Sequence, residues 1–174
     1  MSDKSSVEQT STHHSVTPEA FRNGMAGLPG TVNIVTTDGD EGKAGFTATA
    51  VCSVSDNPPT LLVCLNRGTS VYNVFSKSET LAINTLDQGF DALSNLFGGK
   101  AAMQDRFASA QWETLTTGSP VLVGAAVTFD CVITERLSVA THDVFFCRVV
   151  DIKQQEKAGA LLYHQRQYRQ LDAI

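Results

Sequence analysis

Three short polar stretches, set between apolar runs of this 174-residue chain, have the residue types to contact a ligand. The first is GFTATA at residues 45–50, whose small and hydroxylated residues leave backbone N–H and C=O groups free to meet the edge of a flat ligand. The same pattern suits a strand whose threonines point outward, and pattern alone favours that interpretation. A binding strand and an ordinary alternating strand are therefore both open here.

The other two stretches lie in predicted turns. Asn66 to Ser70, NRGTS, follows a predicted strand and precedes a predicted helix, so its N–H donors and hydroxyls could hold an anion such as phosphate. Capping of that helix by Ser70 explains the segment equally well. The third stretch, Thr141-His142-Asp143, joins two long predicted strands. The pattern favours a hairpin turn in which Asp143 bonds the backbone and His142 is exposed.

The chain lacks the motifs of several common enzyme classes. It contains no GxGxxG or Walker A loop and no GxSxG nucleophile turn. Only His142 and His164 lie outside the first 16 residues, so the sequence predicts no metal site. The cysteines stand in apolar runs without CxxC spacing and are predicted to be buried free thiols: Cys52, Cys64, Cys131 and Cys147.

Composition indicates one globular domain. Apolar residues make up 42% of the chain and charged residues 18%. The net charge of −5, without a basic stretch, argues against a nucleic-acid partner. No membrane span or secretory signal is visible, so we expect a cytoplasmic protein with no membrane partner. Residues 1–16 are predicted to be a disordered polar tail, and residues 17–174 the folded domain.

The hydrophobic period changes along the chain from helical to strand-like. A helix is expected to begin at Thr17, with Pro18 in its first turn and one apolar face: Phe21, Met25 and Leu28. We expect strands over residues 31–37, 43–54, 60–66, 79–86, 121–138, 142–152 and 160–164, and helical segments over 70–76, 90–97 and 101–108. Successive strands with few crossover helices predict a mainly β fold, an antiparallel barrel with peripheral helices.

In their order and spacing these segments resemble the short-chain NAD(P)H:flavin reductases, which have a split β-barrel fold. The resemblance runs from Phe21 to Tyr168 through FRNGM, TVNIVTTDG, GFTATAVCSVSDNPPTLLVCLNRGTSV, LAINTL, LSNLFGGK with a following RF, THD, and LLYxxRxY. It is greatest toward the flavin reductase components of pyrimidine-utilisation and 4-hydroxyphenylacetate 3-monooxygenase systems. One position departs from the family, because Thr141 stands where many members have Gly.

The resemblance implies NAD(P)H-dependent reduction of FMN or FAD, with reduced flavin supplied to a partner monooxygenase. It implies FMN or FAD and NADH as cofactors, with NADPH as the alternative donor, and a homodimer as the assembly. No acid–base residue is implied, because the two cofactors exchange a hydride directly. Two other functions are open: a flavin-binding barrel protein without turnover, and oxidation of a phosphorylated amine on a related barrel.

The resemblance also assigns residues to the site. His142 would position the nicotinamide, and Asp143 would hold its ring or the turn. The residues implied in flavin binding are Thr47, Ala48, Thr49 and Ala50 along the ring, Asn66, Ser70, Lys100 and Arg106 at the phosphate or ribityl end, and Asn84. Asn84 has a structural alternative, in which it satisfies backbone groups at a strand end.

Overall fold

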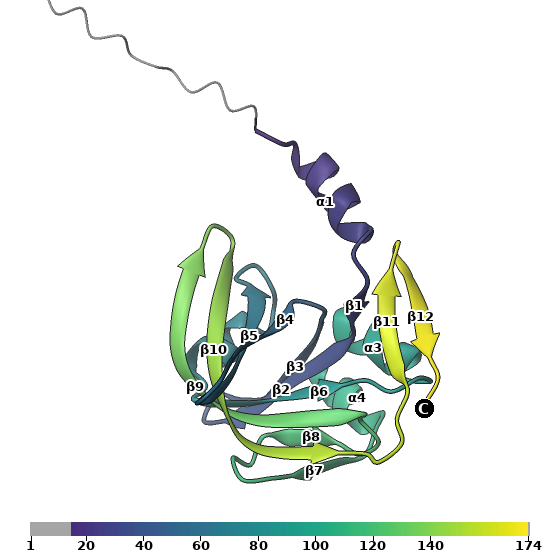
Figure 1. Ribbon diagram of the computed structural model, residues 1–174. Helices are drawn as coiled ribbons and strands as arrows, with labels where there is room; N and C mark the ends of the chain where they lie inside the picture. The colour runs from purple at the N-terminus through teal and green to yellow at the C-terminus, as the bar shows by residue number, and fades with distance from the viewer. Residues whose placement is uncertain (1–14, 174) are drawn as a thin grey trace, which may run out of the picture.

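The computed structural model describes residues 15–173 and shows a mainly β protein with helices at the rim of a curved sheet (Figure 1). The strands of the central sheet are β2 (Asn33–Gly39), β3 (Gly42–Ala48), β4 (Val51–Asp56), β5 (Pro59–Asn66), β6 (Thr80–Thr85), β9 (Val127–Val139) and β10 (His142–Gln154). All neighbouring pairs are antiparallel, as the sequence predicts. The predicted disordered tail, residues 1–16, lies outside the described residues except for Ser15 and Val16.

The central sheet has the strand order β3-β2-β6-β9-β10-β5-β4, so the two consecutive strands β3 and β4 are its outer strands. In the described residues no ladder joins these two strands, and the predicted barrel is open on that side. The single strand predicted over 43–54 is therefore wrong. The chain bends at Thr49 and Ala50, where Val51 N donates to Thr49 O and Cys64 N donates to Ala50 O, at 2.9 and 3.1 Å.

Smaller elements surround this sheet. They are α1 (Pro18–Ala26), β1 (Gly30–Thr31), α2 (Tyr72–Lys77), α3 (Asp91–Gly98), α4 (Met103–Ala108), β7 (Trp112–Thr114), β8 (Pro120–Leu122), β11 (Ala160–His164) and β12 (Gln167–Leu171). The predicted strand 121–138 is two strands, β8 and β9. Between them the chain turns at Gly124, whose φ of 92° favours glycine. No strand was predicted after residue 164, but Gln167–Leu171 form β12, which pairs with β11 and is mostly exposed.

Two apolar clusters form the core. One is centred on Phe75, Leu81 and Phe145 and packs α2 against the inner face of the curved sheet. The other is centred on Phe97 and Leu161 and packs α3, β8 and β11 against the face of β2 that carries Ile34, opposite the face that carries Val35. Burying side chains of this size contributes about 1.5–3 kcal/mol each. The two clusters therefore fix α3 and the β11–β12 hairpin relative to β2 and β3.

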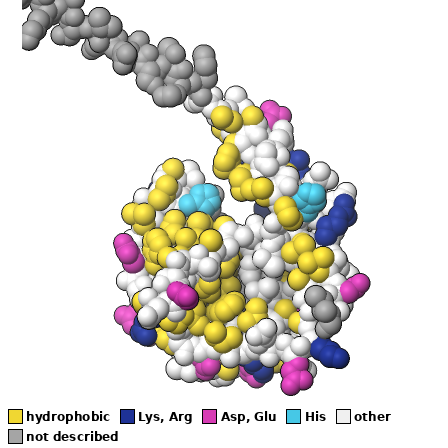
Figure 2. Space-filling view, in the orientation of Figure 1, with side chains coloured by type: hydrophobic (Ala, Val, Ile, Leu, Met, Phe, Trp, Pro, Cys, Tyr) yellow, Lys and Arg dark blue, Asp and Glu magenta, His cyan; other side chains and the backbone are white. Residues whose placement is uncertain are grey.

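Helix α1 begins as predicted but does not pack as an amphipathic helix should. The hydroxyl oxygen of Thr17 accepts from Ala20 N at 3.1 Å, and Pro18 is the first helical residue. The expected apolar face is exposed, with Phe21, Met25 and Leu28 at 62%, 48% and 61% of full exposure. The helix buries no residue and projects from the body of the molecule (Figures 1 and 2).

The prediction of four buried thiols is wrong for Cys52. Cys131 and Cys147 are buried, Cys64 is half-buried, and Cys52 is exposed on the edge strand β4. Burial raises the pKa of the Cys131 thiol well above its usual range and that of Cys147 to about 12, so both are inert as nucleophiles. Of the helices described here, none has the length and apolar character to cross a bilayer.

Candidate functional site

The three polar stretches singled out in the sequence meet around one cavity of about 220 Å³, here called the bend cavity. Its lining includes all four residues of the β3–β4 bend predicted to contact a ligand, together with Asn66 and His142. The full lining is Phe46, Thr47, Ala48, Thr49, Ala50, Cys64, Leu65, Asn66, Thr69 and His142. Strand pairing explains the convergence, because β5 lies between β4 and β10 and places Asn66 opposite His142.

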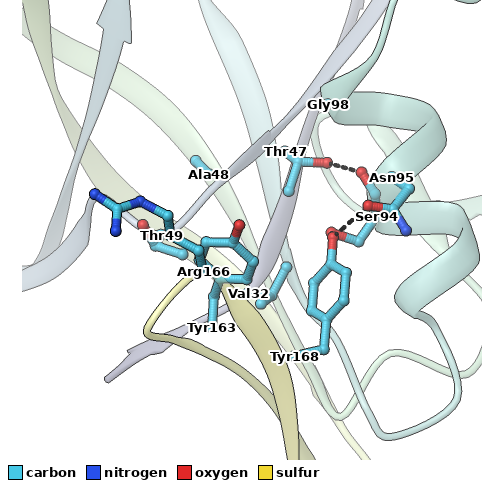
Figure 3. Close-up of a pocket in the computed structure, with 10 residues that line it drawn as sticks. All are labelled: Val32, Thr47, Ala48, Thr49, Ser94, Asn95, Gly98, Tyr163, Arg166 and Tyr168. Carbon is cyan, nitrogen blue, oxygen red and sulfur yellow. Dashed lines mark hydrogen bonds between the residues drawn. The ribbon is translucent and has the colours of Figure 1, made fainter. Parts of the chain in front are cut away.

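A second cavity of about 420 Å³ adjoins the first and shares Thr47, Ala48 and Thr49 with it. Its other walls come from α3 and from the β11–β12 hairpin, so we call it the hairpin cavity (Figure 3). Its remaining lining residues are Val32, Ser94, Asn95, Gly98, Tyr163, Arg166 and Tyr168. Sequence reasoning did not assign these residues to the site. The signals for them were three segments of the resemblance: TVNIVTTDG with Val32, LSNLFGGK with Ser94, Asn95 and Gly98, and LLYxxRxY with Tyr163, Arg166 and Tyr168.

A chain of hydrogen bonds stiffens the wall of the hairpin cavity. Thr47 Oγ1 donates to the carbonyl of Ser94 at 2.7 Å, which ties β3 to α3. The hydroxyls of Ser94 and Tyr168 are 2.8 Å apart, and the Tyr168 hydroxyl donates to Asn95 Oδ1 at 3.0 Å (Figure 3). The cavity therefore has a fixed wall of hydroxyl and amide groups, the chemistry that suits a polyhydroxylated ligand.

Asp143 organises the turn beside His142. Its carboxylate is 5% exposed and accepts from the Tyr72 hydroxyl at 2.7 Å, the Ser138 hydroxyl at 2.7 Å and Arg67 Nη1 at 3.0 Å. The bonds from Tyr72 and Ser138, followed by Arg67, hold the pKa of Asp143 below its usual value despite burial. The bond to Asp143 also raises the pKa of Tyr72. Asp143 is therefore an ionised residue that holds the turn.

His142 itself is exposed and lines the bend cavity. Its Nδ1 is hydrogen-bonded to the Thr141 hydroxyl at 2.9 Å, and no bond joins its ring to Asp143 among the described contacts. Successive strand residues point to opposite faces, which separates the two side chains. Thr141, the residue that departs from the family pattern, thus supplies the contact that holds the His142 ring.

Two residues predicted to bind flavin are structural. Asn84 is fully buried, and its amide donates to Ile34 O and Thr36 Oγ1 while its oxygen accepts from Leu122 N and Thr128 Oγ1. Four bonds leave that side chain no capacity for a ligand, so its structural alternative is the one that fits.

Arg106 is 4% exposed, and its guanidinium donates to the carbonyls of Gly45, Phe97, Gly99 and Ala101 at 2.8–3.2 Å. It clamps the end of α3 to β3 and lines neither cavity. The prediction that it binds a phosphate fails because the side chain points into the protein.

The last two predicted residues lie near the cavities without lining them. Lys100 is exposed, two residues beyond Gly98 of the hairpin cavity. Ser70 is exposed, next to Thr69 of the bend cavity. Capping by Ser70 is not observed, because α2 begins after Val71 and has no side-chain cap. Within residues 15–173, no three His, Cys, Asp or Glu side chains gather as a metal ion requires.

The donor set of the adjoining cavities fits a flat heterocycle with a polar tail. The bend cavity offers small residues and backbone groups, and the hairpin cavity offers hydroxyls, an amide and one guanidinium. A family model described as flavin reductase like domain matches residues 25–172.

Similar proteins are known from sequence and from crystallography. The FMN reductase (NADH) RutF of Pseudomonas syringae pv. syringae (strain B728a) is 57% identical over 152 residues, which cover 87% of this chain and 85% of that protein. A crystal structure from Haemophilus somnus 129PT, assigned as a flavin reductase, matches with a TM-score of 0.88, 47% identity and coverage of 90% and 100% of the two chains. Flavin reductase PheA2 matches with a TM-score of 0.80, 30% identity and coverage of 90% and 99%.

Proposed function

The chain belongs to the flavin reductase-like family, and from this premise we propose that its two adjoining cavities together hold a flavin and NADH for hydride transfer. The protein is an NADH-dependent flavin oxidoreductase, and FMN is the acceptor named for its Pseudomonas syringae relative. The observation that supports the proposed site is the meeting of three polar stretches, far apart in sequence, around the bend cavity.

Each lining residue has a role that its chemistry allows. A bound flavin would supply the hydride acceptor and a bound NADH the donor, so no residue of this chain would have to remove a proton from carbon. Residues Thr47 to Ala50 offer backbone groups to the ring edge, and Asn66 offers a side-chain amide. His142, on the facing strand β10, orients the nicotinamide through proximity and angle. Asp143 acts only through the turn that carries His142.

The test follows NADH by its nicotinamide absorbance while FMN is added to purified protein. We expect catalytic loss of NADH that saturates with added FMN. Tight FMN binding without loss of NADH would instead identify a flavin-binding protein. Turnover of a phosphorylated amine in the absence of NADH would identify the third function. Parallel assays compare the rate with FAD against that with FMN as acceptor, and the rate with NADPH against that with NADH as donor.

We infer that a separate monooxygenase consumes the reduced flavin. The lining residues Thr49, Ala50, Asn66 and His142 are exposed, so the bend cavity opens to solvent and a ligand can exchange. The test places this protein and a flavin-dependent monooxygenase on opposite sides of a dialysis membrane under anaerobic loading. Hydroxylation after oxygen is admitted is the expected outcome. A flavin that stays bound through dialysis and turnover would contradict transfer.

We further propose a homodimer. Phe21 and Met25 of helix α1 and Leu28 after it are exposed, the helix buries nothing, and a larger apolar area occupies part of the face of the body seen in Figure 2. A permanent interface buries upwards of about 2,000 Å². Light scattering at micromolar concentration should give twice the chain mass, and a monomer that still binds FMN would exclude the dimer.

We also propose a cytoplasmic location. The four cysteines are free, and two of them are buried as thiols, which suits a reducing compartment that supplies NADH. Fractionation of cells that express the tagged chain should place it with the cytosolic marker, and recovery in a membrane or secreted fraction would contradict the proposal.

A further inference from the structure

We propose that Arg166 binds a nucleotide phosphate at the hairpin cavity, an inference that rests on the proposed function and names the anion-binding residue of its site. The prediction from sequence had assigned this task to Lys100 and Arg106. The structure places Arg106 inside the protein on four carbonyls, so a different cation must meet the ligand's negative charge.

Among the described residues that line the two cavities, Arg166 is the only lysine or arginine. Figure 3 shows its guanidinium at one end of the hairpin cavity, with Tyr168, Ser94 and Asn95 at the other. The protein carries a net charge of −5, so a phosphate needs a local cation to be held. Arg166 is placed to supply it.

The charge of Arg166 is not neutralised by the protein. Its guanidinium donates to the amide oxygen of Asn23, on α1, at 2.6 Å. The ion pairs found in residues 15–173 involve other cations: Lys43, Arg67, Lys77 and Lys153. A neutral amide orients the guanidinium and leaves its remaining N–H groups and its full charge for an incoming anion.

The backbone at Arg166 adopts a conformation that is unfavourable for a residue with a long side chain. Gln165 and Arg166 form the two-residue turn between β11 and β12, with φ values of 50° and 60°. Both central residues of such a turn favour Gly or Asn, and longer side chains are strained there. The turn is held to the end of α1, because Gln165 N donates to Ala26 O at 2.7 Å. This turn places Arg166 in the wall of the hairpin cavity.

The phosphate can come from either ligand of the reaction. FMN carries one phosphate ester and NADH carries a diphosphate, and the hairpin cavity adjoins the bend cavity where the two rings would meet. The recognising chemistry is the same, a guanidinium bonded to phosphate oxygens. The experiment therefore has one arm for each source.

The first arm compares FMN with riboflavin, which lacks only the phosphate. Binding is measured by quenching of flavin fluorescence with the wild type, Arg166→Ala and Arg166→Lys, at low and high KCl. Arg169→Ala is the matched control, because Arg169 lies on the same hairpin, is exposed and lines neither cavity. We expect Arg166→Ala to weaken FMN binding about 5- to 20-fold, with riboflavin unchanged and Arg166→Lys in between.

The second arm measures kcat/KM for NADH with riboflavin as the acceptor. A loss confined to FMN binding identifies the flavin phosphate, and a loss confined to NADH identifies the diphosphate; either result supports the proposal. Unchanged FMN binding together with unchanged kcat/KM overturns it, as does an equal loss in Arg169→Ala. The binding arm needs no turnover. A wild type that binds FMN but oxidises no NADH would therefore disprove the proposed function separately.

Discussion

The β9–β10 turn and the β11–β12 turn are built alike and stand on opposite sides of the cavities (Figure 1). Each joins two strands through two residues, and each places non-glycine residues at positive φ: Ala140 at 48° in the first, Gln165 and Arg166 in the second. The first turn is followed by His142, the first residue of β10, and the second contains Arg166; each of these two side chains lines a cavity. A two-residue turn with a non-glycine residue at positive φ therefore stands on both sides of the site.

The two turns differ in how their charges are paired. In the first, Arg67 is bonded to the Asp143 carboxylate and to the carbonyls of Ala140 and His142, so the protein itself neutralises its charge. In the second, Arg166 is bonded to the neutral side chain of Asn23. A carboxylate compensates the charge of Arg67, whereas the neutral amide beside Arg166 leaves the charge of that guanidinium uncompensated. Arginine thus holds the first turn through Arg67, and in the second turn it is the residue that we propose binds a phosphate, Arg166.

Among the changes at the first turn, replacing His142 with Ala should have the largest effect on activity. We expect kcat/KM for NADH to fall about 10- to 100-fold, because the nicotinamide loses the side chain that orients it. FMN affinity should stay near that of the wild type. Steady-state kinetics with NADH varied at saturating FMN gives the first number and fluorescence quenching the second. A variant with normal kcat/KM would show that His142 is only a turn residue.

Asp143→Asn should give a milder form of the same defect, a loss of about 5- to 10-fold, because the turn loosens while His142 is retained. It should also change the dependence of stability on pH. The folded-state pKa of Asp143 lies below its unfolded value of about 3.9, so its contribution is present above about pH 4 and is lost as pH falls through the folded pKa.

Urea unfolding of wild type and Asp143→Asn between pH 2 and pH 7 tests this contribution. The variant should be less stable at pH 7, and the difference should shrink toward pH 2. Asp38→Asn is the control, since Asp38 is exposed and its nearest cation, Lys43, is 3.7 Å away. If the difference in free energy of unfolding between the two proteins stays constant with pH, the ionised carboxylate of Asp143 does not stabilise the fold.

Features of the fold that depend on local sequence could be predicted. Most of the strands followed from period and order, because β-branched runs bounded by turn residues define strands whatever their partners, whereas the residues of the bend cavity were assigned to a site only through the family resemblance. The helix start at Thr17 and Pro18 was local and therefore predictable. The polar strand β12 was missed because its edge position leaves it without an apolar face.

The roles of buried polar side chains depended on partners far away in sequence. Arg106 bonds to Gly45 O, 61 residues earlier, and Asn84 bonds to Ile34 O, 50 residues earlier. No local pattern separates such a residue from one that binds a ligand. The hairpin cavity was missed for a related reason: its walls come from β3, α3 and the β11–β12 hairpin, which only the tertiary fold brings together.

Replacing Gln165-Arg166 with Asn-Gly tests whether the second turn is strained. We expect the free energy of unfolding to rise by about 1 kcal/mol, because Asn and Gly adopt positive φ at less cost. The variant should also lose the preference for FMN over riboflavin. Gln165→Gly alone is the control, and it should gain stability and keep the preference. Thermal unfolding supplies the measurement, and an unchanged midpoint in both variants would show that the turn stores no strain.

The smallest expected effect belongs to Thr141. Thr141→Val keeps the shape of the side chain and removes the hydroxyl that bonds His142 Nδ1, whereas Thr141→Ser keeps the hydroxyl. One hydrogen bond at an exposed site contributes about 0.5–1 kcal/mol, so KM for NADH should rise about 2- to 4-fold in the valine variant while kcat and FMN affinity hold. The ring ¹⁵N resonances of His142 should shift in the valine variant only. A serine variant as impaired as the valine variant would assign the effect to packing of the turn, and a valine variant with wild-type KM and resonances would show that the hydroxyl does not orient the ring.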